Sequence, residues 1–235
     1  MTKVTNKPKI CKAAESVAQV VLQTQLQVAY HFPCPIYITE RPDFLEVVNT
    51  VSEEALEVQR KKRDLNEIYP VYMTGSYFGD SRMAGFSEFV GATAWNILND
   101  QGYAMQDKAV QFMEMWTQEH HKHSAMDAHV HGYGSQIVGF YFLETPEGGA
   151  NVVFHDPRAG KVQNDLPEQD TSIATPASKM INFTPKPGMM IFANSWLSHS
   201  FTRHAADLPI KFVHFNLAVI HQPQTCAIPP AAEII

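Results

Sequence analysis

Asp127-Ala128-His129-Val130-His131 is the stretch around which this chain is organised. It begins a region with strong strand signals, and alternate side chains of a strand share one face. His129 and His131 should therefore point the same way, and Asp127 and Tyr133 should lie on that face too. Two imidazoles on one face can bind one metal ion, but an H-x-H pattern also occurs by chance among surface histidines. A metal site therefore needs a third ligand from elsewhere in the chain.

His199 is the candidate for this third ligand. It follows the apolar segment 188–194 and the residues Ser195-Trp196-Leu197-Ser198. In a jelly roll the late strands lie against the early ones, so distance along the sequence does not separate His199 from His129 and His131. Three ligands with open positions suit non-haem Fe(II), because substrate and O2 must also reach the ion.

Strand signals dominate the sequence after Gly102. Turn sequences such as Thr-Pro-Glu-Gly-Gly at 145–149 and Pro-Lys-Pro-Gly at 185–188 separate the strands. Many short strands after a helical part are typical of a double-stranded β-helix, the jelly-roll or cupin-like architecture, with helices packed outside it. The predicted strands are 109–118, 127–133, 135–145, 150–156, 179–184, 188–194, 199–204 and 210–221.

The sequence before Gly102 predicts mainly helices. The predicted helices are 13–27, 42–63 with Asp43 as N-cap, and 86–101 with Ser87 as N-cap. Residues 28–39 contain Pro33 and Pro35 and predict an edge strand or a linker, because proline cannot donate to a sheet.

We expect a single domain over residues 1–235. A helical N-terminal part at 1–102 should pack on a double-stranded β-helix core at 103–221, followed by a tail at 222–235. The polar loop 157–178 is long for a compact domain, which is typical of a mobile lid or an insertion over a site.

Composition limits the classes of function. The net charge of −6 argues against nucleic-acid binding, which usually needs a basic face. The first residues lack the apolar core of a signal peptide, and no apolar run is long enough to span a bilayer. The three cysteines, Cys11, Cys34 and Cys226, have no C-x-x-C spacing and predict neither a disulfide framework nor a zinc site. We therefore predict a cytoplasmic protein without a membrane or nucleic-acid partner.

Several motifs in order resemble the 2-oxoglutarate/Fe(II) oxygenases of bacteria and marine phages. The resemblance spans roughly residues 28–221, and Trp116 matches a tryptophan before the ligand strand. The motifs are His31-Phe32-Pro33-Cys34-Pro35-Ile36-Tyr37, the run from His129 to Leu143, Phe154-His155-Asp156-Pro157-Arg158, Pro187-Gly188 through Ser195-Trp196-Leu197-Ser198-His199, and Phe215-Asn216.

The resemblance implies a double-stranded β-helix that holds Fe(II) and uses 2-oxoglutarate as cosubstrate. The acid would be oxidised to succinate and CO2 while a C–H bond of a second substrate is hydroxylated. By position, His129, His131 and His199 would be the metal ligands. Most of the wider superfamily has Asp or Glu where this chain has His131, so Asp127 is an alternative ligand.

A second departure concerns the arginine that usually binds the distal carboxylate of 2-oxoglutarate. The corresponding position in the last strand holds Ile210, and strand alternation turns its neighbour Lys211 to the opposite face unless a bulge intervenes. The candidates for binding this cosubstrate are Lys211, Arg203, Arg158, Tyr141 and Asn216. The other histidines considered are interpreted as structural or solvent-exposed: His120, His121, His123, His155 and His214.

We therefore predict a non-haem Fe(II), 2-oxoglutarate-dependent oxygenase that acts on a peptide side chain or a small molecule with O2. A homodimer is left open. Two alternatives remain: a three-histidine cupin-type metal dioxygenase that works without 2-oxoglutarate, and a non-catalytic cupin-like binding module.

Overall fold

The computed structural model of the chain describes residues 29–132 and 134–222. The chain divides into two units, Met1–Cys34 and Pro35–Ile235, and every helix and strand of the described residues belongs to the second. The helix predicted for 13–27 lies outside the described residues, as does the predicted tail apart from Gln222. The single-domain organisation stays a prediction.

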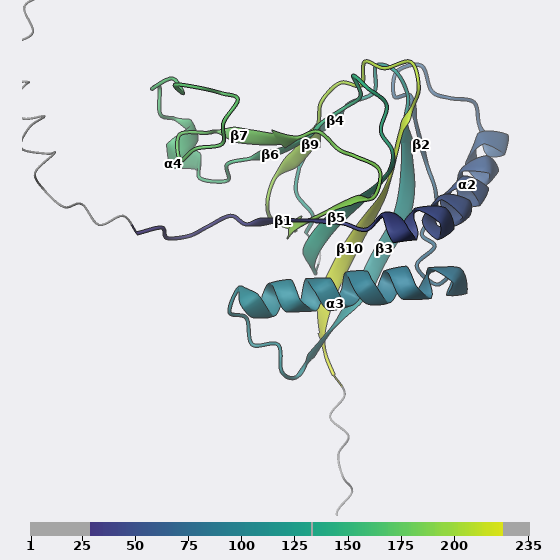
Figure 1. The fold of residues 1–235 in the computed structure, drawn as a ribbon, viewed down its shortest axis with the longest axis horizontal. Helices are drawn as coiled ribbons and strands as arrows, with labels where there is room; N and C mark the ends of the chain where they lie inside the picture. Colours follow the sequence, from purple (N-terminus) through teal and green to yellow (C-terminus); the bar gives the residue numbers. More distant parts are fainter. Residues whose placement is uncertain (1–28, 133, 223–235) are drawn as a thin grey trace, which may run out of the picture. The chain divides into compact units, whose positions relative to one another are not determined.

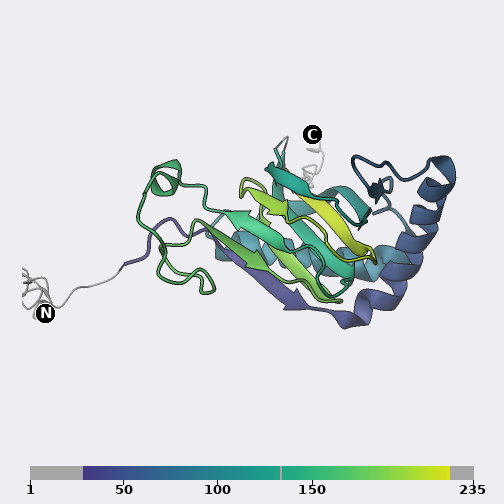
Figure 2. The ribbon, with the colours of Figure 1, turned by 90° about the horizontal axis from the view of Figure 1, so that it is seen from above.

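Two antiparallel sheets form a double-stranded β-helix, which confirms the predicted fold class (Figures 1 and 2). The six-stranded sheet has the order β1-β8-β5-β10-β3-β2. Its strands are β1 (Ile36–Glu40), β8 (Met189–Asn194), β5 (Ser135–Glu144), β10 (Ile210–His221), β3 (Lys108–His120) and β2 (Val71–Met73). The four-stranded sheet consists of β4 (Met126–His129), β9 (His199–Phe201), β6 (Val152–His155) and β7 (Met180–Phe183), in that order.

Two helices cover the outer face of the six-stranded sheet, and Figure 1 shows α3 lying across its strands. They are α2 (Leu45–Lys62) and α3 (Ala84–Asp100). Their apolar stripes, which include Val48, Phe86 and Val90, form one core cluster with Val213 and Phe215 of β10. Burial of each large apolar side chain contributes roughly 1.5–3 kcal/mol, so this cluster fixes the helices on the sheet.

The central strand β10 is buried on both faces, because helices cover one side and the second sheet covers the other. Val213 and Phe215 face the helices, whereas Phe212 and His214 face the four-stranded sheet. The ring of Phe212 stacks on Phe201 of β9 with centroids 4.6 Å apart. The space between the two sheets is therefore lined by even-numbered residues in this part of β10.

The strands predicted after Gly102 are all present, with shifted ends, and β1 is an edge strand as predicted. Two differences matter for the site. β4 ends at His129 instead of continuing to residue 133, and β2 lies in the stretch 64–84, where no strand was predicted. Three residues are too few to produce a recognisable alternation.

Both predicted helix caps are wrong because a short 3-10 turn precedes each helix. The turn η1 (Pro42–Phe44) contains Asp43, whose carboxylate pairs with the Arg41 guanidinium at 2.6 Å. Before α3, the turn η2 (Ser81–Met83) is capped by Asp80, which accepts from the Arg82 backbone N–H. Ser87 consequently lies inside α3.

The long loop predicted at 157–178 contains the short helix α4 (Ala159–Val162). Figures 1 and 2 show this segment extending away from the two sheets beyond β6 and β7. No helix in the described part of the chain has the length and apolar character needed to cross a membrane.

Gly139 provides a test of how tightly the six-stranded sheet is packed. A Cβ at this position would lie 2.3 Å from the Phe215 ring and 2.7 Å from the carbonyl oxygen of Ile191. We expect Gly139→Ala to lower the free energy of unfolding by ~1–3 kcal/mol in chemical denaturation, since a backbone oxygen cannot easily move away. The control is Gly91→Ala in α3, where a Cβ meets no atom within 4 Å and alanine should stabilise the helix. Equal effects of the two substitutions would contradict this packing.

Candidate metal centre

The pairing of β4 with β9 brings two of the predicted ligands together. His129 at the end of β4 is the register partner of His199 at the start of β9. His131 lies two residues beyond β4, and its backbone N–H donates to the carbonyl of Ser195 at 2.8 Å. One ligand atom from each of the three histidines lies within 4.8 Å of the other two. These three side chains are therefore close enough to bind one ion.

The hydrogen bonds of two of these rings fix which nitrogen carries the proton. His129 Nδ1 lies 2.8 Å from the carbonyl of Asp127, and His199 Nδ1 lies 3.0 Å from the carbonyl of Leu197. A carbonyl only accepts, so both Nδ1 atoms must donate and both Nε2 atoms carry a lone pair. This is the usual arrangement of metal-binding histidines, whose second nitrogen is held by a backbone carbonyl or a carboxylate.

The remaining nitrogens fit a metal ion. The Nε2 atoms of His131 and His199 are buried and have no hydrogen-bond partner among the described residues. A buried polar atom without a partner costs about 1–3 kcal/mol, so such atoms usually mark a missing ligand. Burial lowers the pKa of His131 to about 4 and that of His199 to about 3. Both imidazoles are thus neutral near pH 7, as metal binding requires.

Asp127 is not brought into this group. The register of β4 against β9 shifts between Met126 and His129, so the simple alternation that placed Asp127 beside His129 does not hold. The Asp127 side chain is exposed, and its carboxylate is not among the clustered donor atoms.

Two of the predicted cosubstrate ligands lie on the helix-facing side of the six-stranded sheet. The ammonium of Lys211 lies 3.0–3.6 Å from the carboxylates of Glu53, Glu119 and Glu144. Tyr141 donates its hydroxyl to the backbone carbonyl of Arg41 at 2.7 Å and packs against Phe86 of α3. Both side chains are therefore engaged on the helix-facing side of the sheet, and their role in binding the cosubstrate stays a prediction.

The two predicted arginines bind neighbouring loop groups. Arg203 donates to the carbonyl of His123 at 3.1 Å. Arg158 binds the Asp156 carboxylate through Nε and Nη2, at 2.9 and 2.7 Å. This bond, together with that of Lys161, holds the pKa of Asp156 well below its usual range.

Asn216 is the one predicted cosubstrate residue that lies on the triad side of β10. It is buried, its Nδ2 lies 3.4 Å from a carboxylate oxygen of Glu114, and its Oδ1 has no partner among the described residues. It shares a face of β10 with His214, whose ring centroid is 4.8 Å from that of His131.

His214, which the sequence suggested to be a structural histidine, lies next to the candidate ligand His131. Its ring stacks on Trp116 with centroids 4.3 Å apart, and burial lowers its pKa well below the usual value. The sequence did contain a sign of this position. His214 alternates with Phe212 and Asn216 along the predicted strand 210–221, so the three side chains share one face.

Beyond the histidines the space between the sheets is filled by aromatic rings. Phe140, Phe142, Phe201 and Phe212 contact one another with centroid distances from 4.6 to 6.4 Å. No lysine or arginine is among the buried residues of the described chain. Among the described residues, the interior next to the metal centre is therefore rich in aromatic rings and contains no buried lysine or arginine.

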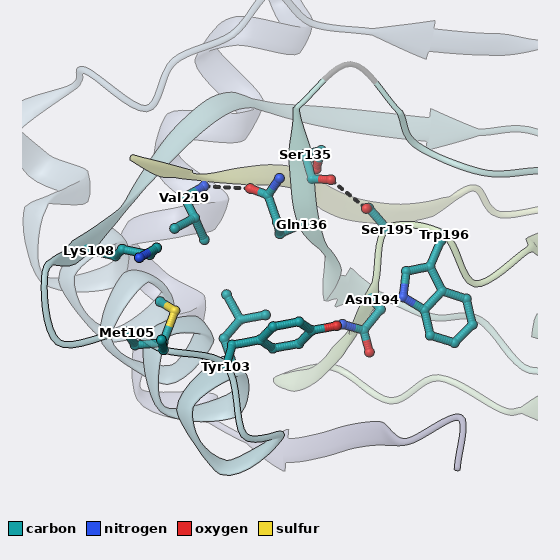
Figure 3. A pocket seen from close by; sticks show the side chains of 11 residues that line it. Tyr103, Met105, Lys108, Ser135, Gln136, Asn194, Ser195, Trp196 and Val219 are labelled. Atoms are coloured by element: carbon teal, nitrogen blue, oxygen red, sulfur yellow. Dashed lines mark hydrogen bonds between the residues drawn. The ribbon is translucent and has the colours of Figure 1, made fainter. Parts of the chain in front are cut away.

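A cavity of about 380 Å³ is lined by residues from the end of α3, the segment 103–108, β5, the end of β8 and β10 (Figure 3). Ser195 connects the cavity wall to His131, because its backbone carbonyl accepts from His131 and its hydroxyl donates to the carbonyl of Ser135 in the cavity wall. The wall is mostly apolar and aromatic, with a few amide and hydroxyl groups. The lining residues are Leu98, Tyr103, Ala104, Met105, Lys108, Ser135, Gln136, Asn194, Ser195, Trp196 and Val219.

Comparison with known proteins agrees with this site. Residues 114–216, which span the strands from β3 to β10, match the family model "Putative 2OG-Fe(II) oxygenase". No curated protein matches the sequence significantly. Over this region, which is less than half of the chain, the sequence is similar to the 2OG-Fe(II) oxygenases. The chain is accordingly an enzyme of the class that uses Fe(II) and 2-oxoglutarate, as the sequence predicted.

Solved structures agree on the fold. A prolyl-4-hydroxylase of Pseudomonas putida aligns with a TM-score of 0.54 at 8% identity, covering 79% of this chain and 93% of that chain. AviO1 from Streptomyces viridochromogenes Tue57 gives 0.56 at 10% identity, covering 81% and 91%. The epimerase SnoN in complex with Fe3+, alpha ketoglutarate and nogalamycin RO gives 0.51 at 14% identity, covering 86% and 88%.

The ligand set can be tested by metal titration. We expect His199→Ala to reduce the affinity for Fe(II) or Mn(II) by at least ~100-fold, because one of three ligands is lost. Asp127→Asn should leave the affinity within ~3-fold of the wild type, since this carboxylate lies outside the cluster. Anaerobic isothermal titration calorimetry measures both, with circular dichroism as the folding control. The opposite ranking of the two variants would restore Asp127 as a ligand.

Burial of His120 predicts a pH-dependent stability. Its pKa is lowered to about 3 by burial and by the neighbouring His204 and His121, so the unfolded chain takes up a proton first as the pH falls. Stability is therefore lost below the unfolded pKa of about 6.5. In metal-free protein we expect His120→Phe to remove about 2 kcal/mol of the loss between about pH 7 and pH 5. Denaturation curves with the same pH slope in both proteins would contradict this assignment.

Proposed function

We propose that this enzyme hydroxylates a C–H bond of an organic substrate, with Fe(II) bound by His129, His131 and His199. The observation that carries the proposal is the convergence of three imidazoles, with one nitrogen of each within 4.8 Å of the other two, in the region that matches the oxygenase family. Bound iron and 2-oxoglutarate supply the oxidation: O2 and the acid yield succinate, CO2 and the hydroxylated product.

The protein groups around the ion explain why a dianionic acid fits. Three neutral imidazoles leave the double positive charge of Fe(II) uncompensated, whereas the usual carboxylate ligand would remove one unit. A 2-oxoglutarate dianion offsets this charge. The aromatic rings of Phe140 and Phe154 lie 5.3 and 5.9 Å from the His199 ring and keep water from that side of the ligand.

The cavity next to Ser195 is our candidate for the primary substrate. Its volume of about 380 Å³ suits a small organic molecule or a single peptide side chain. Tyr103, Met105 and Trp196 offer apolar and aromatic contacts, and the Asn194 and Gln136 amides can orient a polar group. Trp196 is in the loop that leads into His199, three residues before this candidate ligand.

Anaerobic spectroscopy tests the cosubstrate. Addition of 2-oxoglutarate to the Fe(II) protein without O2 should produce a visible charge-transfer absorption, because a 2-oxo acid chelates iron through its carboxylate and keto oxygens. Succinate has no keto group and should produce none, and His199→Ala should abolish the absorption. Tight iron binding without this absorption would instead favour a three-histidine dioxygenase that binds its organic substrate directly. A lack of metal binding would favour a binding module.

A further inference from the structure

A buried polar chain runs along the facing strands β3 and β10, inside the space between the sheets. His120 Nε2 lies 2.8 Å from Gln118 Oε1, and Gln118 Nε2 lies 3.5 Å from His214 Nδ1. All three side chains are at most 2% exposed. The chain ends at His214, next to the proposed metal ligand His131.

The order of donors along this chain determines the tautomer of His214. The amide oxygen of Gln118 only accepts, so His120 must donate from Nε2, and the amide nitrogen is left to donate to His214 Nδ1. Because Nδ1 of His214 accepts, its ring proton is on Nε2. That Nε2–H is fully buried and has no acceptor among the described residues.

His214 lies beside the cluster of candidate metal ligands and is not part of it. Its ring centroid lies 4.8 Å from that of His131 and 6.3 Å from that of His199, but none of its nitrogens belongs to the cluster of metal-binding atoms. A donor at this place can reach an oxygen of a molecule that is itself bound to the ion.

Among the described residues the interior offers no buried lysine or arginine for a second carboxylate. Ile210 occupies the place where the resembling family has its arginine, and its register partner across β3 is His120. Lys211 is held by three carboxylates on the helix-facing side of the sheet. Phe212 and Phe201 stack directly beside the His120 ring and fill the space further in. A carboxylate that enters this space therefore meets the Nε2–H of His214 as the buried donor without a partner.

We infer that His214 Nε2–H binds the distal C5 carboxylate of 2-oxoglutarate, in place of a lysine or arginine. Gln118 and His120 are positioning residues that keep the proton on Nε2. This inference rests on the proposed function, since it takes the acid to be bound to iron at His129, His131 and His199. It makes His214 the residue that distinguishes 2-oxoglutarate from 2-oxo acids without a second carboxylate.

The experiment compares two acids that chelate iron in the same way. 2-Oxoglutarate and 2-oxovalerate are both five-carbon 2-oxo acids, but only the first has a C5 carboxylate. Each is titrated anaerobically into the Fe(II) protein, and the dissociation constant is read from the visible charge-transfer absorption. For the wild type we expect 2-oxoglutarate to bind ~10- to 100-fold more tightly, the range of a hydrogen bond to a charged group.

Two variants of His214 separate the hydrogen bond from the packing. His214→Phe keeps a ring against Trp116 but removes the donor, so the preference for 2-oxoglutarate should disappear while 2-oxovalerate affinity stays within ~3-fold. His214→Gln retains an N–H group and should keep part of the preference. If His214→Phe does not fold, Gln118→Met provides the same test, because His214 then loses the donor that keeps its proton on Nε2 and the preference should fall.

The outcomes are distinct. An unchanged preference in the folded variants overturns the inference, and so does a wild type that binds the two acids equally, although the proposed function would survive both results. An Fe(II) protein that gives no charge-transfer absorption with either acid contradicts the proposed function itself.

Discussion

His129, His131, His199 and His214 share the space between the two sheets, with neighbouring ring centroids 4.5–6.3 Å apart. Burial removes the water that would stabilise a charged imidazolium, and two positive rings at these distances would repel each other. Burial lowers the pKa of His131, His199 and His214, so these three rings are packed here in the neutral form. Neutral imidazoles have free lone pairs, so the constraint that allows the two sheets to close is also the condition for binding a metal ion.

The same constraint separates the charges of this molecule into two regions. On the helix-facing side of the six-stranded sheet, Lys211 and Arg60 pair with Glu53 and Glu119. Between the sheets the described residues contribute histidines, amides and aromatic rings, and no buried cation. A bound metal ion and its anionic ligands would therefore be the charged groups in that space. The positive charge of the ion would balance the negative charge of a dicarboxylic acid.

Much of the fold could be predicted from the sequence, because alternation and turn residues act locally. The strands after Gly102 and the two helices were found this way, and the spacing of His129 and His131 with the later His199 predicted the three histidines that the structure brings together. The helix starts were wrong, since a 3-10 turn precedes each helix: η1 has no side-chain cap, and η2 is capped by Asp80, which the sequence pattern does not distinguish from other polar residues.

The sequence by itself determined the three histidines, the strands that carry them and the loss of the usual arginine at Ile210. Only the tertiary structure decided which other side chains join them. A register shift in β4 left Asp127 outside the cluster, and strand direction placed Lys211 and Tyr141 against the helices. His214 lies next to His131 because β10 pairs with β3 and β5 in the middle of the sheet. Alternation along a strand shows which residues share a face, but only the packing of the sheet shows what that face meets.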